Sequence, residues 1–137
     1  TPTEKNTEAA IEDCLELGRL MGFNRVSVLT PEKHDEMIGF VSQLTHCIAV
    51  SLMNCYDGEK LQDYTGDSFR DLTRIARIND AMWSELFMLN KEPLCFEIDY
   101  IIKSLTEYRD ALMNGDNEKL MALLRDGRIL KENSKKL

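Results

Sequence analysis

Proline and glycine are scarce in this chain, whose 137 residues include 3 prolines and 7 glycines. Because both residues interrupt regular structure, their scarcity leaves room for long helices. Aromatic residues make up only 7%, whereas helix-favouring Leu, Met, Glu, Lys and Ala recur throughout. The composition predicts one mainly α-helical domain, and a hydrophobic content of 43% is enough for a core.

Basic residues are also in the minority, with 17 Lys and Arg against 24 Asp and Glu and a net charge of −7. A nucleic-acid binder would show a basic stripe, so no nucleic-acid partner is expected. No apolar run approaches the roughly 18 residues of a membrane span, and the N-terminus has no signal-peptide pattern. We therefore expect no membrane association.

The four cysteines, Cys14, Cys47, Cys55 and Cys95, lack CxxC spacing and have no paired histidines nearby. Three of them fall on apolar helical positions, where a free cysteine behaves as a small buried hydrophobe. We expect no metal site and a reduced, cytoplasmic protein.

The first thirty residues read differently from the rest. Asn6 or Thr7 can cap a helix that Gly22 ends, and residues 25–29 then alternate polar and apolar like a short strand. One helix and one strand make half of a βαβ unit. We therefore divide the chain into residues 1–30, the end of a truncated α/β domain, and residues 31–137, a helical domain.

The helical domain divides at capping residues and glycines. The predicted helices run from Thr30-Pro31 to about Cys55, with a break at Asp57-Gly58, from Gly66-Asp67-Ser68 to about Ile78, from Asn79-Asp80 onward, from about Pro93 to Leu112, and from Asp116 to about Gly127. The stretches 41–52 and 94–105 are apolar over more than one stripe. A small bundle has little room to cover such surfaces, so we expect a homodimer with interwoven helices.

The stretch 68–76 places Asp71, Arg74 and Ile78 along one side of a predicted helix. An arginine anchored on a mostly apolar helix is a rigid charged fork that can hold a carboxylate through two parallel hydrogen bonds. A salt bridge from Arg74 to Asp71 is the alternative, and the spacing does not choose between them.

Ser42 and His46 form a polar pair four residues apart within an apolar helix. Burying unpaired polar groups costs about 1–3 kcal/mol each, so the pair needs partners. A neighbouring carbonyl would serve His46, and a ligand carboxylate or keto group would serve both. Trp83 is either a core or interface aromatic, or a wall for a ring-shaped ligand.

Taken together, these segments resemble prephenate dehydrogenase. Residues 30–35 resemble its TPEEHD segment, residues 41–46 its SHLPH segment and residues 69–76 its GFRDxTRIA segment, with Met82-Trp83 and Asn90 following at the expected distances. The resemblance implies a helical domain that forms an intertwined dimer, preceded by the last helix and strand of a Rossmann domain.

The family oxidises and decarboxylates prephenate to 4-hydroxyphenylpyruvate while hydride passes to NAD or NADP. The resemblance implies that Arg74 grips a substrate carboxylate, that Ser42 and His46 add polar contacts, that Asp71 pairs with Arg74 and that Trp83 lines the pocket. Thr45 stands where proline is usual, Gln43 replaces a histidine, and Asp67-Ser68 replace glycines.

A glycine-rich GxGxxG loop appears nowhere in the chain. The family's catalytic histidine belongs to the same nucleotide-binding half, so no catalytic or cofactor-binding residue is expected here. On this basis the chain alone should bind no cofactor and be inert. Two alternatives stay open: an arogenate dehydrogenase, and a non-catalytic helical module for dimerisation or effector binding.

Overall fold

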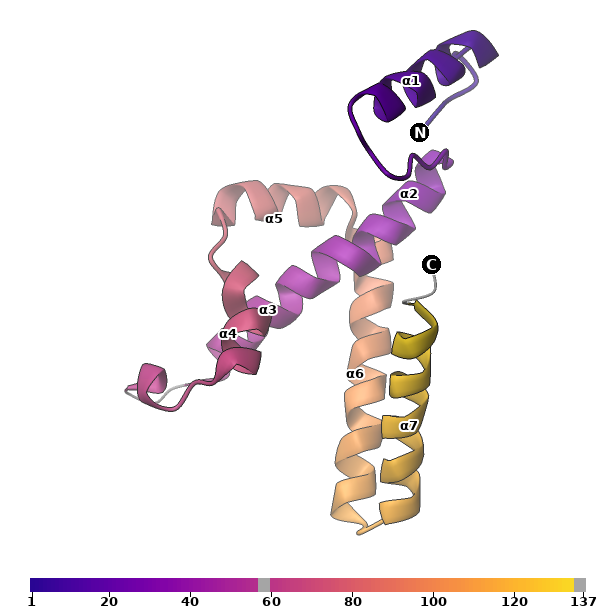
Figure 1. The fold of residues 1–137 in the computed structure, drawn as a ribbon. Coiled ribbons are helices and arrows are strands. Elements are labelled where there is room, and N and C mark those ends of the chain that lie inside the picture. Colours follow the sequence, from indigo (N-terminus) through magenta and orange to yellow (C-terminus); the bar gives the residue numbers. More distant parts are fainter. Residues whose placement is uncertain (57–59, 135–137) are drawn as a thin grey trace. The chain divides into compact units, whose positions relative to one another are not determined.

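The structure is a computed structural model that describes residues 1–56 and 60–134. It divides into two compact units, Thr1–Cys95 and Phe96–Leu137. The α-helices, labelled in Figure 1, are α1 (Glu8–Leu20), α2 (Pro31–Ile38), α3 (Thr45–Asn54), α4 (Asp67–Thr73), α5 (Asp80–Leu89), α6 (Lys91–Met113) and α7 (Asn117–Ser134). Three short turns lie between them: the π-helical turn η1 (Gly39–Leu44) and the 3-10 turns η2 (Leu61–Asp63) and η3 (Arg74–Ala76). The predicted mainly α-helical fold is confirmed.

Helix α1 begins and ends as predicted. The Thr7 side chain accepts a hydrogen bond from the Ala10 amide at 3.2 Å. Gly22 follows the helix with φ +84°, a left-handed conformation that glycine adopts without a side-chain clash. The amide of Phe23 then closes the helix end on the Gly18 carbonyl at 3.1 Å.

The predicted strand over residues 25–29 is wrong, since none of the described residues lies in a strand. A strand needs a neighbour to pair its backbone groups, and the described part of the chain offers none. The segment instead lies close to α1. A β-carbon added at Gly18 would stand 2.6 Å from Val26 Cγ2, so glycine permits this close approach.

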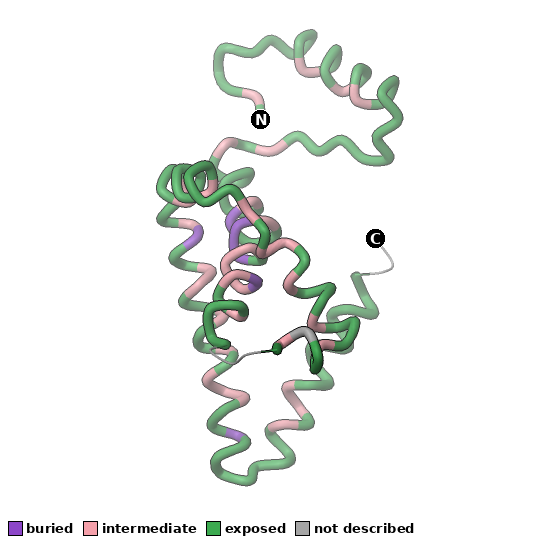
Figure 2. Tube along the Cα trace, turned by 90° about the vertical axis from the view of Figure 1, so that its left-hand side faces the viewer, coloured by how far each residue is buried: buried purple, intermediate pink, exposed green. Residues whose placement is uncertain are grey.

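Helices α2 and α3 and the turn η1 form one continuous helical run, Pro31–Asn54. The Thr30 hydroxyl accepts from the Lys33 amide at 3.2 Å and Pro31 opens the first turn, as predicted. The π-helical turn was not predicted. This run carries most of the buried residues of the first unit: Gly39, Gln43, Leu44 and Ala49 (Figure 2). The predicted break at Asp57-Gly58 lies outside the described residues.

The same run, Pro31–Asn54, is long and apolar enough to cross a membrane by length and composition. The expectation that no segment reaches this length is therefore wrong, because residues 37–54 contain no Asp, Glu, Lys or Arg. A core helix of a globular protein meets the same criterion, and α3 packs against α4 and η3. The absence of a membrane partner stays a prediction.

The helix predicted to reach Ile78 is shorter. Regular α-helix ends at Thr73, and Arg74 opens the tighter turn η3. The Thr73 hydroxyl donates to the Phe69 carbonyl at 2.7 Å, a local bond that competes with regular helix geometry at this point. Both α4 and η3 pack on α3, so this segment stays beside the long helical run.

The second unit pairs the part of α6 after Cys95 with α7 (Figure 1). Gly115 has φ +63°, and the Asp116 amide reaches back to the Ala111 carbonyl at 2.9 Å, which closes the end of α6. Asp116 then caps α7 as predicted, accepting from the Lys119 amide at 2.9 Å. Helix α7 continues beyond Gly127 to Ser134.

Few apolar side chains are buried in the described chain: Leu44, Ala49, Leu94 and Ala111. Large apolar side chains of the second unit are exposed instead, among them Phe96, Tyr100, Leu105, Leu112, Met113 and Leu130. Exposed apolar surface of this extent is typical of an interaction site.

Candidate functional site

His46 and Trp83 are brought together from α3 and α5. Their ring centroids lie 3.8 Å apart at an interplanar angle of 29°, and Phe87 meets Trp83 edge-on at 5.5 Å. His46 Nδ1 lies 2.8 Å from the Ser42 carbonyl oxygen and donates to it. A neutral imidazole with its proton on Nδ1 keeps Nε2 as a hydrogen-bond acceptor. Both rings are half-buried, so the pair combines an aromatic wall with a polar atom.

Ser42 takes part in this arrangement through its backbone. Its carbonyl accepts from the Thr45 hydroxyl at 2.7 Å as well as from His46. The neighbouring-carbonyl alternative for His46 is therefore what the structure contains. The carbonyl belongs to the π-helical turn, so the local helix geometry sets the orientation of the His46 ring.

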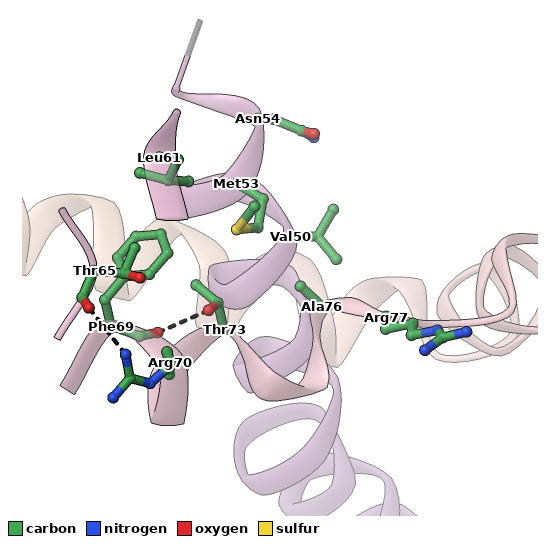
Figure 3. A pocket seen from close by; sticks show the side chains of 10 residues that line it. All are labelled: Val50, Met53, Asn54, Leu61, Thr65, Phe69, Arg70, Thr73, Ala76 and Arg77. Atoms are coloured by element: carbon green, nitrogen blue, oxygen red, sulfur yellow. Dashed lines mark hydrogen bonds between the residues drawn. The ribbon is translucent and has the colours of Figure 1, made fainter. Parts of the chain in front are cut away.

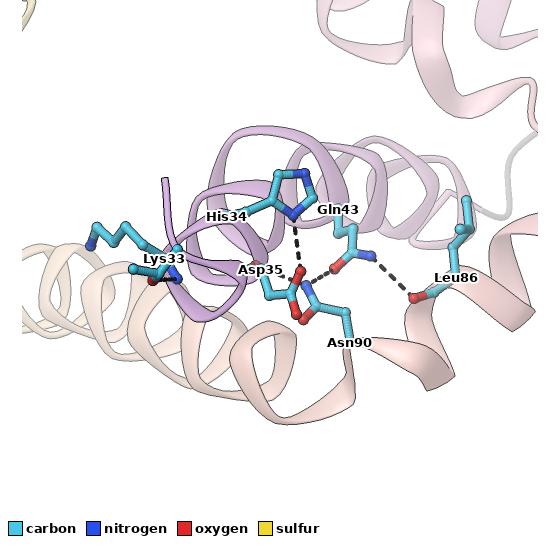
Figure 4. Close-up of polar contacts among 7 residues, drawn as sticks. Lys33, His34, Asp35, Gln43, Leu86 and Asn90 are labelled. Atoms are coloured by element: carbon cyan, nitrogen blue, oxygen red, sulfur yellow. Dashed lines mark hydrogen bonds and ion pairs between the residues drawn. The ribbon is translucent and has the colours of Figure 1, made fainter. Parts of the chain in front are cut away.

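Gln43 is the residue that sequence reasoning missed. It is only 4% exposed, and both polar atoms of its amide have a partner: Nε2 donates to the Leu86 carbonyl at 3.1 Å, and Oε1 accepts from Asn90 Nδ2 at 2.7 Å. Asn90 Nδ2 also donates to the Asp35 carbonyl at 2.9 Å (Figure 4). These bonds join α2, η1, α5 and the start of α6. The only signal in the sequence is an amide within an apolar stretch.

Arg74 and Asp71 are both exposed, and within the described residues no ion pair joins them. The α-helix ends between them at Thr73, so the predicted helical neighbourhood is not formed. Arg74 leaves from η3, which packs on the helix that carries His46. Among the described side chains no hydrogen bond connects Arg74 to His46 or Trp83. The five predicted site residues therefore form one group of three, Ser42, His46 and Trp83, and two separate charges, Asp71 and Arg74.

A hollow of about 640 Å³ lies between α3, α4 and η3 (Figure 3). Its lining is mostly apolar and comprises Val50, Met53, Asn54, Leu61, Thr65, Phe69, Arg70, Thr73, Ala76 and Arg77. Arg70 is held there by the Thr65 carbonyl at 3.0 Å and by an ion pair with Asp67. None of the predicted site residues lines this hollow.

The described residues hold no group of three or more His, Cys, Asp or Glu side chains placed to bind a metal ion. They also do not fit a dinucleotide, because the glycine-rich turn between a strand and a helix that cradles its phosphates is not formed by them. Of the cysteines only Cys47 is half-buried, and that burial raises the pKa of its thiol. Cys14, Cys55 and Cys95 are exposed, so the expectation that three of the four cysteines are buried is wrong.

Comparison with known proteins places this helical fold among oxidoreductases of aromatic biosynthesis. A family model described as "Prephenate dehydrogenase, dimerization domain" matches residues 30–126. The chain belongs to the prephenate dehydrogenase family.

Individual relatives agree. The chain is 31% identical over 126 residues to a prephenate dehydrogenase of Bacillus subtilis, covering 88% of this chain and 33% of the relative. It is 30% identical over 103 residues to a cyclohexadienyl dehydrogenase of Zymomonas mobilis, covering 71% of this chain and 35% of the relative. The structure of prephenate dehydrogenase from A. aeolicus in complex with hydroxyphenyl propionate and NAD+ superposes with a TM-score of 0.84 at 30% identity, over 97% of this chain and 48% of that one. The chain thus spans about a third of the length of these sequence relatives.

Proposed function

We propose that this chain is the substrate-binding and dimerising part of a longer prephenate dehydrogenase, which oxidises and decarboxylates prephenate to 4-hydroxyphenylpyruvate. The family match over residues 30–126 carries the proposal. Arg74 supports it, because within the described residues its guanidinium has no hydrogen bond or ion pair, and a permanently charged group of this kind is available to an anionic ligand.

In this proposal Arg74 holds a substrate carboxylate through two parallel hydrogen bonds. His46 presents Nε2 to the same ligand, Ser42 orients His46 through its carbonyl and adds its hydroxyl, and Trp83 forms the wall against which a six-membered ring lies. Asp71, three residues before Arg74, pairs with the guanidinium while the ligand is away.

The partner in this proposal is a second copy of the chain. The exposed apolar side chains of the second unit, such as Phe96, Leu105 and Leu112, are 68%, 61% and 64% exposed in one copy. Obligate homodimers bury apolar surface of this kind. Interwoven helices would cover these faces, as expected from the sequence.

The cofactor, NAD or NADP, would bind the nucleotide-binding half of the longer protein and accept hydride there. This chain contributes neither a dinucleotide cradle nor the catalytic histidine, so we expect it to be inactive when isolated. A cytoplasmic location suits an enzyme that uses soluble metabolites and nicotinamide.

The test is nicotinamide reduction by the longest natural polypeptide that contains this chain, assayed with prephenate and then with arogenate. Turnover with prephenate is the expected result. Turnover only with arogenate would keep the fold and the site but change the substrate. A folded dimer that turns over neither substrate would replace the proposal with the alternative of a non-catalytic dimerisation or effector-binding module.

A further inference from the structure

The helical run Pro31–Asn54 meets α5 through two contacts one helical turn apart, one from η1 and one from α3. Gln43 donates to the Leu86 carbonyl at 3.1 Å, and His46 stacks on Trp83. His46 follows Gln43 by three residues, whereas Trp83 precedes Leu86 by three. Residues three apart lie on the same side of a helix, so both contacts belong to one antiparallel crossing. The first contact is polar and buried, and the second is aromatic and half-buried.

The buried contact is fixed from several directions. Gln43 has one donor bond and one acceptor bond, and Asn90 uses the same amide group to bind Gln43 and the Asp35 carbonyl (Figure 4). A buried amide with its polar groups paired is costly to displace, because any sliding of α5 along α3 would leave a donor or acceptor without a partner. The pair Gln43–Asn90 therefore sets the register between the two helices.

The π-helical turn makes this register matter. A π turn closes i to i+5 and holds one more residue than an α turn, which rotates everything after it by about 100° around the helix axis. Gln43 lies inside that turn, and the Ser42 carbonyl, also inside it, receives His46 Nδ1 at 2.8 Å. The hydrogen bonds that fix Gln43 therefore also fix the Ser42 carbonyl, which orients the His46 ring.

We propose that Gln43 and Asn90 are positioning residues that keep the π-helical turn in place and thereby stack His46 on Trp83. The effect of this positioning on ligand binding rests on the proposed function, in which His46 and Trp83 face the ligand. Neither amide needs to touch the ligand. Gln43 stands where the family's SHLPH segment has a histidine, whose ring N–H is also able to donate to a carbonyl.

The experiment reads the stack directly by NMR, in the longest natural polypeptide with isotopically labelled histidine. Protons of a ring stacked over an indole move upfield, and Trp83→Leu defines the unstacked position of the His46 signals. The variants Gln43→Leu and Asn90→Leu keep side-chain volume but remove the polar network. Gln43→His is the conservative variant, and Ala111→Gly in the second unit is the control that weakens a helix elsewhere.

We expect the upfield His46 signals in the parent, in Gln43→His and in Ala111→Gly, and their loss in Gln43→Leu and Asn90→Leu. In the enzyme, KM for prephenate should rise about tenfold in the two leucine variants with a smaller change in kcat, the effect of losing about one polar contact to the ligand. Folded leucine variants that keep the upfield signals would overturn the proposal.

If Gln43→Leu does not fold, Asn90→Leu tests the proposal alone. It removes two of the three hydrogen bonds of the network and leaves Gln43 in place. A parent enzyme that turns over neither prephenate nor arogenate would refute the proposed function only. The NMR comparison would still decide whether the two amides hold the stack.

Discussion

The two parts of the proposed site differ in how their polar groups are paired. Around Gln43 and His46 the side-chain amides and the ring Nδ1 have protein partners at 2.7–3.1 Å. Around Arg74 the charged groups are exposed, and within the described residues Arg74 and Asp71 are not paired. The paired part, Gln43 and His46, is organised before any ligand arrives. The open part, Asp71 and Arg74, keeps its charge available for a ligand.

Burial explains the difference. Gln43 is 4% exposed, where an unpaired polar group would cost about 1–3 kcal/mol, so the fold must satisfy it internally. Arg74 is exposed, where solvent is available to its guanidinium and an exposed salt bridge would contribute less than about 1 kcal/mol. The fold alone thus orients the stack of His46 on Trp83, whereas Arg74 gains a partner only when an anion binds.

The largest effect is expected when the open part is removed. Arg74→Ala in the enzyme should raise KM for prephenate roughly thirty-fold to several-hundred-fold, because a charge-assisted bidentate contact contributes on the order of 2–4 kcal/mol. Steady-state kinetics measure this. Arg77→Ala, an exposed arginine three residues further on, is the matched control and should change KM little. An unchanged KM in Arg74→Ala would exclude the anchoring role.

A smaller effect is expected when the paired part is damaged. His46→Ala removes the stack on Trp83 and the bond to Ser42, which together should lower the free energy of unfolding by about 1–3 kcal/mol. Urea denaturation measures this. KM for prephenate should rise roughly tenfold. His34→Ala is the control, since the His34 side chain is exposed and its one polar contact within the described residues is with its neighbour Asp35. Equal effects of the two substitutions would show that the stack contributes nothing.

The smallest effect concerns Cys47, one residue after His46 on α3. Burial raises the pKa of its thiol, so at pH 8 it carries less thiolate than an exposed cysteine and should react with iodoacetamide more slowly than Cys14 or Cys55. Mass spectrometry of each cysteine over time measures these rates, and denatured protein should show equal ones. Comparable rates in the folded protein would mean that α3 is less well packed than its partners indicate.

The raised pKa of Cys47 also makes the stability of the folded chain depend on pH. The folded state disfavours the Cys47 thiolate, so the unfolded chain loses its proton first, near the ordinary pKa of 9.0. The stability associated with the protonated thiol is present below that pH and declines as the pH rises toward the raised folded-state pKa.

Much of the fold was predictable because local chemistry determines it. Thr7, Thr30, Asn79 and Asp116 cap helices as their side chains indicate, and Gly22 and Gly115 end helices with positive φ. The predicted strand failed because strand formation depends on a distant neighbour rather than on local alternation. The π-helical turn was not predictable, since it depends on what Gln43 meets across the helix crossing.

The candidate site was predicted less completely. Spacing alone put Ser42 and His46 in one place, and the structure adds Trp83 to them. The same spacing argument failed for Asp71 and Arg74, because the α-helix that would align them ends at Thr73. Gln43 was noted only as a departure from the family's pattern, since the partners that give it a role lie 43 and 47 residues away. The roles assigned to the five predicted residues stay predictions.

The turn at Gly115 has a consequence for the order in which the chain assembles. It closes α6 on α7 through neighbours in sequence, and Lys119 meets Glu107 across the hairpin at 3.4 Å. Contacts this local form quickly, whereas the bond from Asn90 to Asp35 must close a loop of 55 residues. The hairpin of the second unit should therefore be in place, with its apolar side chains in water, before the crossing of α3 and α5 is complete. Slow formation of that crossing would prolong the exposure, so the folding chain is prone to aggregate until a second copy covers the hairpin.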